Sequence, residues 1–410
     1  MGTASVPQFE KTVVTTGAVA ENSPIFAGTS KVDITPGKEV YIAGYGQNRL
    51  STGTHDPVWA RCLVLEIGNT RTAFLALDLV GLFLGDVEKI RNGAANELLP
   101  AENIIVSSTH NHEGPDTMGL WGPNIMQSGV DDDYLLSVRE MAVKCIKSAE
   151  KNLVKAEIKI GQTYVDGVAK NGRDEGILDP VLVAMQATCD GETIGTLVNF
   201  ANHPEALGSE NTLISSDWPN YMYNIIEDLL GGVCIFQNGA LGGMVTPDVR
   251  NHSFEETERV GLTTGRCAIG CLEGATHMDC RGIDHISSKI RIPVANEKFL
   301  ALRNAGIIKR DFVDGEVETE IHLLRFGSVE MVTLPGEALP GVGLSVKKLM
   351  KAEHKILIGL GNDELGYIIP EQDFDKTKYE ESMSVGPKAA PRIEDAIKSM
   401  YQVTNGTLNG

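Results

Sequence analysis

Long apolar runs, a secretion signal and clustered basic residues are all missing from this sequence of 410 residues. No apolar run approaches the roughly 20 residues of a membrane-spanning helix. Residues 1–27 contain no charged and then apolar signal. The net charge of −19, without a local basic stripe, would repel a phosphate backbone. We therefore expect no transmembrane segment and no nucleic-acid partner.

Cysteine is not arranged in the patterns that form disulfide frameworks or metal clusters. The seven cysteines are an odd number, and most of them lie within apolar runs. Because no CxxC pair is present, we interpret Cys267, Cys271 and Cys280 as thiols of the core and not as metal ligands. Unpaired thiols favour a reducing compartment such as the cytoplasm.

The composition is that of a large soluble globular protein, with 42% hydrophobic and 22% charged residues. Apolar runs typical of strands alternate with segments of helical spacing, and hairpins lie between them. This pattern predicts an α/β fold, with a single large domain built on a mixed β-sheet core that is flanked by helices. Residues 1–25 are polar and are predicted to be an irregular segment, and residues 26–410 are predicted to form the domain.

The clearest chemical signal follows a predicted strand over residues 103–108, a short apolar run with β-branched residues. His110 and His112 come next, before a Gly-Pro pair that ends the strand. If the chain stays extended from Thr109 to His112, both imidazoles point to the same side, because side chains two apart share one face. Two histidines at the end of a strand suit a metal site.

Three later strands also run into polar, turn-rich stretches with metal-ligand side chains. These stretches carry His203, Glu337, and Tyr367 with Asp363 and Glu364. In open α/β sheets, sites form beyond the carboxyl ends of the strands. Two histidines, a glutamate and one more oxygen ligand are a good set for Zn²⁺ and leave a position for water or substrate. We therefore predict a metal site at the C-terminal ends of strands.

Each of these residues also has an ordinary structural interpretation. A single histidine after a strand is more often a hydrogen-bonded structural residue, Glu337 is placed to cap the next helix, and Tyr367 fits a core. Asp78, inside an apolar strand, is either a hydrogen-bonded structural carboxylate or part of the site. The joint placement of the ligand types is what favours the metal interpretation.

Together, the motifs resemble those of the neutral/alkaline (non-lysosomal) ceramidases, zinc amidohydrolases that split N-acylsphingosine. The resemblance extends from about Gly28 to the C-terminus. Residues 109–115, Thr-His-Asn-His-Glu-Gly-Pro, are similar to the family's Thr-His-Thr-His-Ser-Gly-Pro. Further similar segments, in family order, are residues 55–61, 200–204, 334–337, 366–367 and 379–380.

The resemblance implies a set of site residues. It implies one Zn²⁺ per chain, held by His110, His203, Glu337 and Tyr367. His112 would line the pocket and polarise the scissile carbonyl or stabilise its oxyanion. Arg173 would bind near the reacting carbonyl, where an arginine also suits an acidic substrate group; its alternative interpretation is an exposed salt bridge.

The sequence departs from the family at the segment that carries the nucleophile, Gly-Asp-Val-Ser-Pro-Asn. Residues 243–248 read Gly-Met-Val-Thr-Pro-Asp, so Thr246 replaces the serine and Met244 replaces its acidic neighbour. The Thr246 hydroxyl can attack or hold a water, although its methyl group crowds the metal. Attack by a metal-activated water is the alternative, and Thr246 is also a typical turn residue. The family's C-terminal β-sandwich-like domain is not evident, which argues against lipid-membrane substrates.

These observations predict a ceramidase-like catalytic domain that hydrolyses a linear amide, either ceramide-like or a smaller soluble N-acyl compound, with a role in lipid and sphingolipid metabolism. One alternative is an esterase or a metal-dependent phosphoesterase, with a second metal held by Asp78, Asp217 or Asp248. Another is a metal-containing binding protein that has lost catalysis. The compartment stays open, because members of the family are often exported, and the oligomeric state is not predicted.

Overall fold

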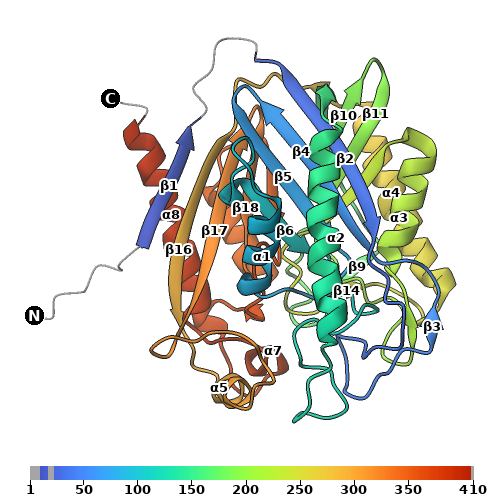
Figure 1. Cartoon of the computed structure of the whole chain (residues 1–410), viewed down its shortest axis with the longest axis vertical. Coiled ribbons are helices and arrows are strands. Elements are labelled where there is room, and N and C mark those ends of the chain that lie inside the picture. The colour runs from blue at the N-terminus through green and yellow to red at the C-terminus, as the bar shows by residue number, and fades with distance from the viewer. Residues whose placement is uncertain (1–9, 17–22, 408–410) are drawn as a thin grey trace, which may run out of the picture.

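The computed structural model describes residues 10–16 and 23–407 of the chain (Figure 1). Three five-stranded sheets form its framework, and each has one parallel and three antiparallel strand pairs. The predicted α/β class with mixed sheets flanked by helices is therefore confirmed. The core is shared among three sheets and is not built on one.

The three sheets have equivalent strand orders: in each, a parallel pair comes first and three antiparallel pairs follow. The first runs β6 (Ile104–Ser108), β5 (Thr70–Leu77), β4 (Trp59–Ile67), β2 (Ile25–Asp33), β7 (Val154–Lys155). The second runs β13 (Val233–Asn238), β11 (Glu192–Phe200), β10 (Val181–Cys189), β8 (Glu157–Tyr164), β15 (Thr276–His277). The third runs β20 (His354–Ile358), β18 (Val329–Thr333), β17 (Glu316–Phe326), β16 (Asp284–Pro293), β1 (Glu10–Thr16).

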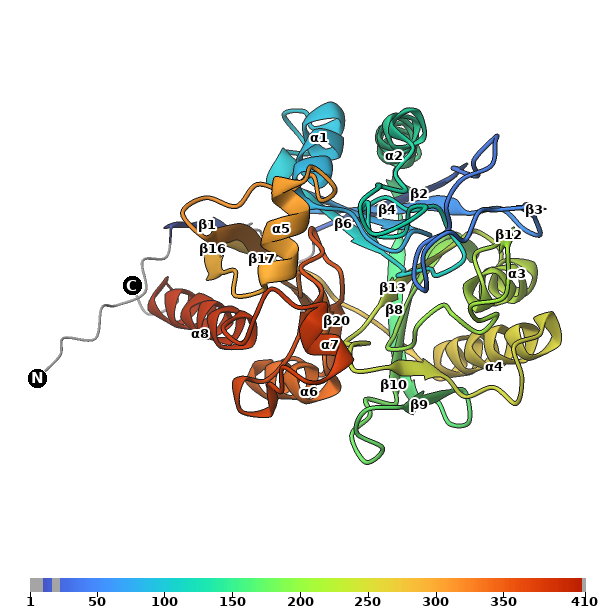
Figure 2. The ribbon, with the colours of Figure 1, turned by 90° about the horizontal axis from the view of Figure 1, so that it is seen from below.

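Two helices accompany each sheet at equivalent places. In the three sheets they are α1 (Leu84–Ala94) and α2 (Asp132–Lys151), α3 (Trp218–Leu230) and α4 (Phe254–Glu273), and α6 (Pro340–Leu349) and α8 (Ala389–Thr407). The first helix of each pair connects the two parallel strands, and the second packs on the antiparallel strands, as α2 does on β2 and β4 (Figure 2). The fold is therefore a threefold structural repeat, although the sequence shows no repeat.

The N-terminal strand completes the third repeat. In the first two repeats the outermost strand, β7 or β15, follows the second helix and lies antiparallel to its neighbour. In the third repeat this place is taken by β1, which pairs antiparallel with β16. The prediction of an irregular segment was therefore wrong for residues 10–16, where a run of threonine and valine favours a strand once a sheet edge is available. The rest of residues 1–22 lies outside the described residues.

A hydrophobic core lies between the three sheets. Leu63 of β4, Leu197 of β11 and Leu324 of β17 belong to one buried cluster that draws on all three sheets. Separate clusters fill the space between each sheet and its helices. Because many strands are buried on both faces, they read as continuous apolar runs without alternation.

Short elements lie in the loops that join the longer strands and helices. They are β3 (Gly53–Thr54), β9 (Ala169–Asn171), β12 (Leu213–Ile214), β14 (Val245–Pro247), β19 (Glu337–Ala338), β21 (Tyr367–Ile368), η1 (Ala101–Asn103), η2 (Glu371–Asp373), α5 (Glu297–Asn304) and α7 (Tyr379–Ser382). All seven cysteines are free thiols. Among the described residues, no helix combines the length and the apolar character that crossing a bilayer requires.

A buried polar chain joins the first sheet to the third. His285 lies between the Asn103 amide oxygen, at 2.9 Å, and the Nδ1 atom of His322, at 2.8 Å. His322 in turn contacts Glu320, which also forms an ion pair with Arg91 of α1. Burial, together with the charges of His322 and Arg91, holds the pKa of His285 well below its ordinary value.

This histidine pair predicts a loss of stability in mild acid. His285 stays neutral in the folded chain but takes up a proton in the unfolded chain below about pH 6.5. The free energy of unfolding should therefore fall as the pH decreases from about 6.5, by up to about 1.4 kcal/mol per pH unit. This contribution is absent in His285→Asn. Denaturant unfolding at pH 6.5 and at pH 5 should therefore show a smaller decrease in the free energy of unfolding for the variant than for the wild-type protein. Equal decreases for the two proteins would contradict the prediction.

Candidate metal centre and adjoining cavity

The loops that follow the parallel strands of the three repeats converge at one end of the sheets. His110 and His112 follow β6, His203 follows β11, and Glu337 follows β18. The Asn238 side chain at the end of β13 donates hydrogen bonds to the Thr109 carbonyl at 2.9 Å and to the Asn202 carbonyl at 2.8 Å. An amide of the second repeat therefore holds the two histidine loops together.

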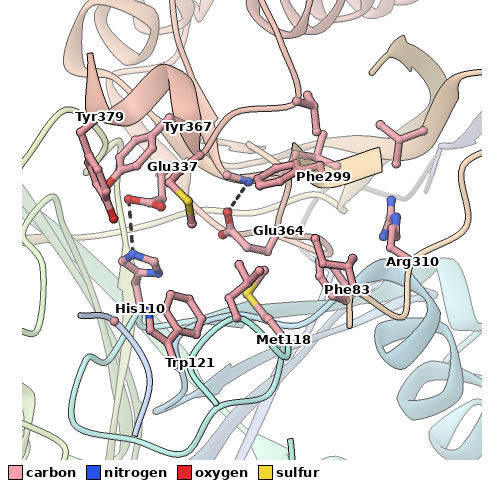
Figure 3. A pocket seen from close by; sticks show the side chains of 18 of the residues that line it. Phe83, His110, Met118, Trp121, Phe299, Arg310, Glu337, Glu364, Tyr367 and Tyr379 are labelled. Atoms are coloured by element: carbon pink, nitrogen blue, oxygen red, sulfur yellow. Dashed lines mark hydrogen bonds and ion pairs between the residues drawn. The ribbon is translucent and has the colours of Figure 1, made fainter. Parts of the chain in front are cut away.

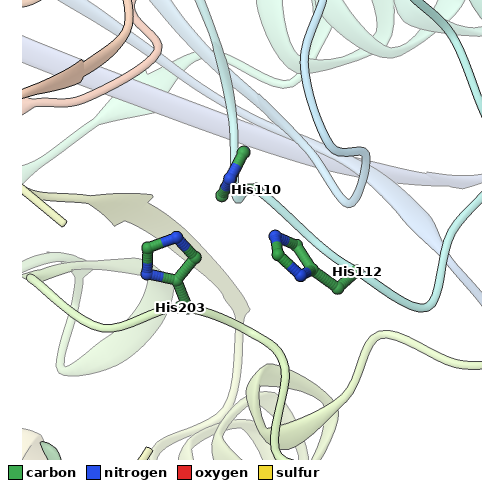
Figure 4. Close-up of side chains that lie close together, drawn as sticks. All are labelled: His110, His112 and His203. Carbon is green, nitrogen blue, oxygen red and sulfur yellow. The ribbon is translucent and has the colours of Figure 1, made fainter. Parts of the chain in front are cut away.

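The three histidines form a compact buried group (Figure 4). Their ring centroids lie 4.9 Å apart for His110 and His112, 4.9 Å for His110 and His203, and 5.4 Å for His112 and His203. One ligand atom from each lies within 4.8 Å of the others, and all three side chains are buried. Among the described residues, this is the group of histidine, cysteine and carboxylate side chains that is arranged to hold a metal.

His110 and His112 face one site, but not for the reason that the sequence suggests. The backbone of His110 has φ of 66°, in the left-handed region, so the chain does not stay extended after β6. The turn is held by hydrogen bonds from Asn111 N to Leu79 O at 3.1 Å and from His112 N to Pro204 O at 3.0 Å. Such a conformation costs about 1–3 kcal/mol and persists where the surroundings impose it, commonly at functional sites.

Backbone carbonyls orient two of the imidazoles. The Nδ1 atom of His110 lies 2.6 Å from the Val80 carbonyl oxygen, and that of His203 lies 2.7 Å from the Val245 carbonyl oxygen. Each Nδ1 therefore carries the proton, and each Nε2 is left with its lone pair directed at Glu337. The Oε2 atom of Glu337 lies 3.3 Å from Nε2 of His110 and 3.2 Å from Nε2 of His203.

This arrangement fits a bound metal ion. Histidine ligands of metals commonly donate their second ring N–H to a carbonyl or carboxylate, which fixes the tautomer and the ring orientation. Glu337 pairs with Tyr367 through the short strands β19 and β21, and the two side chains line the same end of the cavity. Burial and Glu337 raise the pKa of Tyr367, whereas His110 and His203, against the effect of burial, hold the pKa of Glu337 below its ordinary value. All four side chains predicted as ligands are thus brought together.

His112 has a carboxylate partner that the sequence did not single out. Its Nδ1 atom lies 3.1 Å from Oε2 of Glu205. Burial, with the charges of the other two histidines, lowers the pKa of His112 to about 4. For Glu205, burial acts in the opposite direction, but His203 and His112 lower its pKa to about 2. Glu205 lies two residues after His203, and this spacing was the available signal.

Thr246 lies next to this pair. It is part of β14, which pairs with β9 so that Thr246 stands opposite Lys170. The Thr246 side chain lies beside Glu205 and contributes to the low pKa of this carboxylate, which also contacts His112. The preceding residues Gly243 and Met244 have positive φ, which turns the chain back toward the site.

Arg173 lies beside the Thr246 loop but is held by acidic partners. Its guanidinium lies 2.7 Å from Oε1 of Glu381 and 3.1 Å from Oε2 of Glu380. The Cδ atom of Arg173 is 3.5 Å from where a Cβ at Gly243 would lie, so the ion pair packs against the loop. The alternative interpretation, an exposed salt bridge, is wrong about exposure, because the Arg173 side chain is only 3% exposed. The contact with a reacting carbonyl stays a prediction.

Other acidic residues have structural partners. Asp78 accepts hydrogen bonds from Tyr223 Oη at 2.9 Å and from Ser216 Oγ at 2.8 Å; burial raises its pKa to about 6. Asp217 caps α3 through the Trp218 N–H, as its position before a proline predicts. Asp78 is thus a hydrogen-bonded structural carboxylate.

A narrow apolar cavity opens from the centre (Figure 3). His110, Glu337 and Tyr367 line one end of it. Its volume is about 50 Å³, roughly one third of the ~150 Å³ of an engineered protein cavity that admits benzene. Apolar side chains form most of the remaining wall: Phe83, Met118, Leu120, Trp121, Phe299, Ile308, Phe312, Val317, Leu365, Met383 and Val385. Glu364 lies on the wall between the two ends, and burial raises its pKa well above the ordinary value.

The chain is similar to neutral ceramidases in sequence and in fold. Residues 26–176 match the family model described as "Neutral/alkaline non-lysosomal ceramidase, N-terminal". A neutral ceramidase of Mycobacterium tuberculosis is 21% identical over 287 residues, which are 59% of this chain. The match covers 44% of that relative's length, so the chain spans less than half of it.

Two solved structures share the fold. The crystal structure of the neutral ceramidase from Pseudomonas aeruginosa aligns with a TM-score of 0.78 at 18% identity, over 92% of this chain and 74% of that chain. A structure described as a ceramidase complexed with C2 aligns with a TM-score of 0.76 at 18% identity, with the same coverage. Residues 26–176 therefore carry the N-terminal signature of the neutral/alkaline non-lysosomal ceramidases, and the chain has the fold of the two solved ceramidase structures.

Proposed function

We propose that this protein is a zinc-dependent hydrolase of a linear amide, acting on an N-acyl compound that is ceramide-like or smaller and soluble. The observation that carries the proposal is the meeting of His110, His203 and Glu337 around one point, with both Nε2 atoms free of other partners, at the end of an apolar cavity. The match of residues 26–176 to the ceramidase family model supports the amide as the bond that is cleaved.

Zinc suits this ligand set and would be held, one ion per chain, by His110, His203, Glu337 and Tyr367. When bound, the ion polarises a carbonyl group and lowers the pKa of a coordinated water to about 7. The remaining chemistry falls to residues beside the ligands.

His112 and Glu205 lie beside the proposed ligands and complete the site. The His112 Nδ1 atom lies 3.1 Å from Glu205 Oε2, and His112 Nε2 is buried, faces the histidine group and has no hydrogen-bond partner among the described residues. An imidazole held in this way can polarise a carbonyl oxygen and stabilise the oxyanion that forms on it. Arg49 fixes this histidine by donating to its backbone carbonyl. The loop therefore presents His112 in one orientation.

The attacking group is either the Thr246 hydroxyl or a water molecule that Thr246 holds. Glu205 is the base that can take the proton in both cases, since its carboxylate lies beside the Thr246 side chain. Arg173, tied to Glu380 and Glu381, holds the Gly243 side of the same loop and is proposed to bind near the reacting carbonyl.

A phosphoesterase with a second metal is the weaker alternative. It needs a second metal ion about 3.5–4 Å from the first, held by a further set of carboxylates. Asp78 and Asp217 are engaged in hydrogen bonds to Tyr223 and Trp218, and Asp248 forms an ion pair with Lys170 at 3.4 Å. All three aspartates already have protein partners, which favours one bound metal over two.

The test is to measure metal content and amide hydrolysis together. We expect close to one zinc per chain, loss of turnover after chelation, and recovery on adding zinc, with N-acyl amides of graded acyl length as substrates. Phosphate esters should not be turned over. A protein that binds one zinc but hydrolyses no amide in the panel would instead be the binding protein considered as an alternative.

A further inference from the structure

The wall of the cavity is apolar along most of its length, and one carboxyl group interrupts it. Glu364 follows β20 and is 3% exposed. In Figure 3 its side chain lies between the histidine end of the cavity and the end formed by Phe83 and Phe299. An ionisable side chain is unexpected on such a wall, because burial of a polar group away from water is unfavourable unless it is hydrogen-bonded.

Only one of the two carboxyl oxygens of Glu364 is hydrogen-bonded within the described part of the chain. Oε1 accepts a hydrogen bond from the Gly366 N–H at 2.7 Å. Oε2 is buried and has no hydrogen-bond partner. Buried polar atoms are nearly always paired in folded proteins, so an orphan on a cavity wall points to a ligand atom that pairs with it.

Arg310, the cation at the far end of the cavity, does not form an ion pair with Glu364. Arg310 donates to both carboxylate oxygens of Asp363, at 2.6 and 2.5 Å, and to the Glu318 carbonyl oxygen at 2.5 Å. Asp363 is further bound by Thr319 Oγ1 at 2.8 Å. Asp363 and Arg310 thus satisfy each other. Asn362 Nδ2 is also unpaired, but Asn362 does not line the cavity, whereas Glu364 with its unpaired Oε2 atom does.

We propose that Glu364 Oε2 binds a hydroxyl group on the apolar chain of the substrate. The preferred substrates are then N-acyl amides whose aliphatic chain carries one hydroxyl group part of the way along, and not amides of a plain fatty acid. This inference rests on the proposed function, because it assigns the cavity to the substrate of the same centre. Glu364 is a specificity-determining residue and takes no part in bond cleavage.

A hydroxyl group is the chemistry that fits this position. It donates to a carboxylate and accepts from a carboxylic acid, so it pairs with Glu364 in either protonation state. The narrowness of the cavity favours a flexible aliphatic chain over a ring, and Met118 and Met383 on the wall can adjust to such a chain. A site built to hydrogen-bond a hydroxyl group rejects the analogue that lacks it much more strongly than an apolar pocket rejects an added methylene.

Binding of the product acids tests this inference without requiring turnover. Calorimetric titration of the zinc-loaded protein would compare a plain fatty acid with hydroxy acids of equal length, in which the hydroxyl is moved along the chain one carbon at a time. We expect one position to bind at least about tenfold more tightly than the plain acid. In Glu364→Leu the preference should reverse, and in Glu364→Gln, which keeps hydrogen-bonding atoms, much of it should remain.

The control is Glu371→Leu, which removes an exposed glutamate from η2 and should keep the wild-type preference. A wild-type protein that prefers the plain acid over every hydroxy acid would overturn the inference, as would an unchanged preference in Glu364→Leu. A hydroxyl preference in binding, without hydrolysis of any amide, would support the inference and contradict the proposed hydrolase, so the two failures can be told apart.

Discussion

Replacing His110 with asparagine is expected to lower kcat/KM for amide hydrolysis by about a thousandfold or more, together with loss of the bound zinc. The Nε2 atom of His110 faces Glu337 and His203, and its other nitrogen is fixed by Val80, so the replacement removes one of the proposed ligands. A metal contributes several kcal/mol to stabilising the transition state, and each 1.36 kcal/mol is a factor of ten in rate.

Asparagine is chosen because His110 lies in the left-handed region, where asparagine is tolerated better than alanine. The fold should therefore survive, and circular dichroism with a thermal melt would verify this. The matched control is His277→Asn, since His277 is 68% exposed and lies on β15, away from the histidine group. Full zinc content and full activity in His110→Asn would exclude His110 as a ligand.

Local signals in the sequence were sufficient for many elements of the fold. The Asp-Trp-Pro start of α3 and the extent of α4 can be recognised in the sequence, because a capping carboxylate and an uninterrupted helical spacing act within one turn. The hairpin at the centre of each of the three sheets can be recognised as well, since a short turn joins its two strands. These elements depend on neighbours in sequence.

The threefold repeat could not be predicted from the sequence. The repeats share strand order and helix placement, whereas each position needs only an apolar residue of suitable size, so little similarity of sequence remains. Strand β1 pairs with β16 more than 250 residues later, and no local pattern indicates such a partner. The full length of β16 is also hard to predict, because its first half, from Asp284 to Ser288, is polar in several positions and resembles a loop in the sequence.

At the site, the residue types were predictable but their roles toward one another were not. Histidine and glutamate after strands could be found from the sequence, because strand ends and turn residues are local features. The left-handed turn at His110, the pairing of His112 with Glu205, and the engagement of Arg173 by Glu381 depend on contacts between loops of different repeats. These contacts decide which side chains bind a metal, which orient others and which remain unpaired.

Thr246 is the residue whose replacement should separate chemistry from binding. We expect Thr246→Ala to reduce kcat by about 10²–10⁴-fold, because the hydroxyl that attacks or holds the water is lost. Thr246→Ser keeps the hydroxyl and removes the methyl group, so it should retain most of the activity or exceed it. In both variants the zinc content and KM should change little, since Thr246 is not among the proposed ligands.

A second comparison tests whether Thr246 acts through Glu205. The Thr246 side chain lies beside this carboxylate, which also contacts His112 at 3.1 Å. If the two residues move one proton together, the double variant Thr246→Ala with Glu205→Gln should be hardly slower than the slower single variant, because groups that act as a unit are strongly non-additive. Losses that multiply would show separate roles. An unchanged kcat in Thr246→Ala would mean that the attacking group is a water held by other residues, and Glu205 would then act through His112 alone.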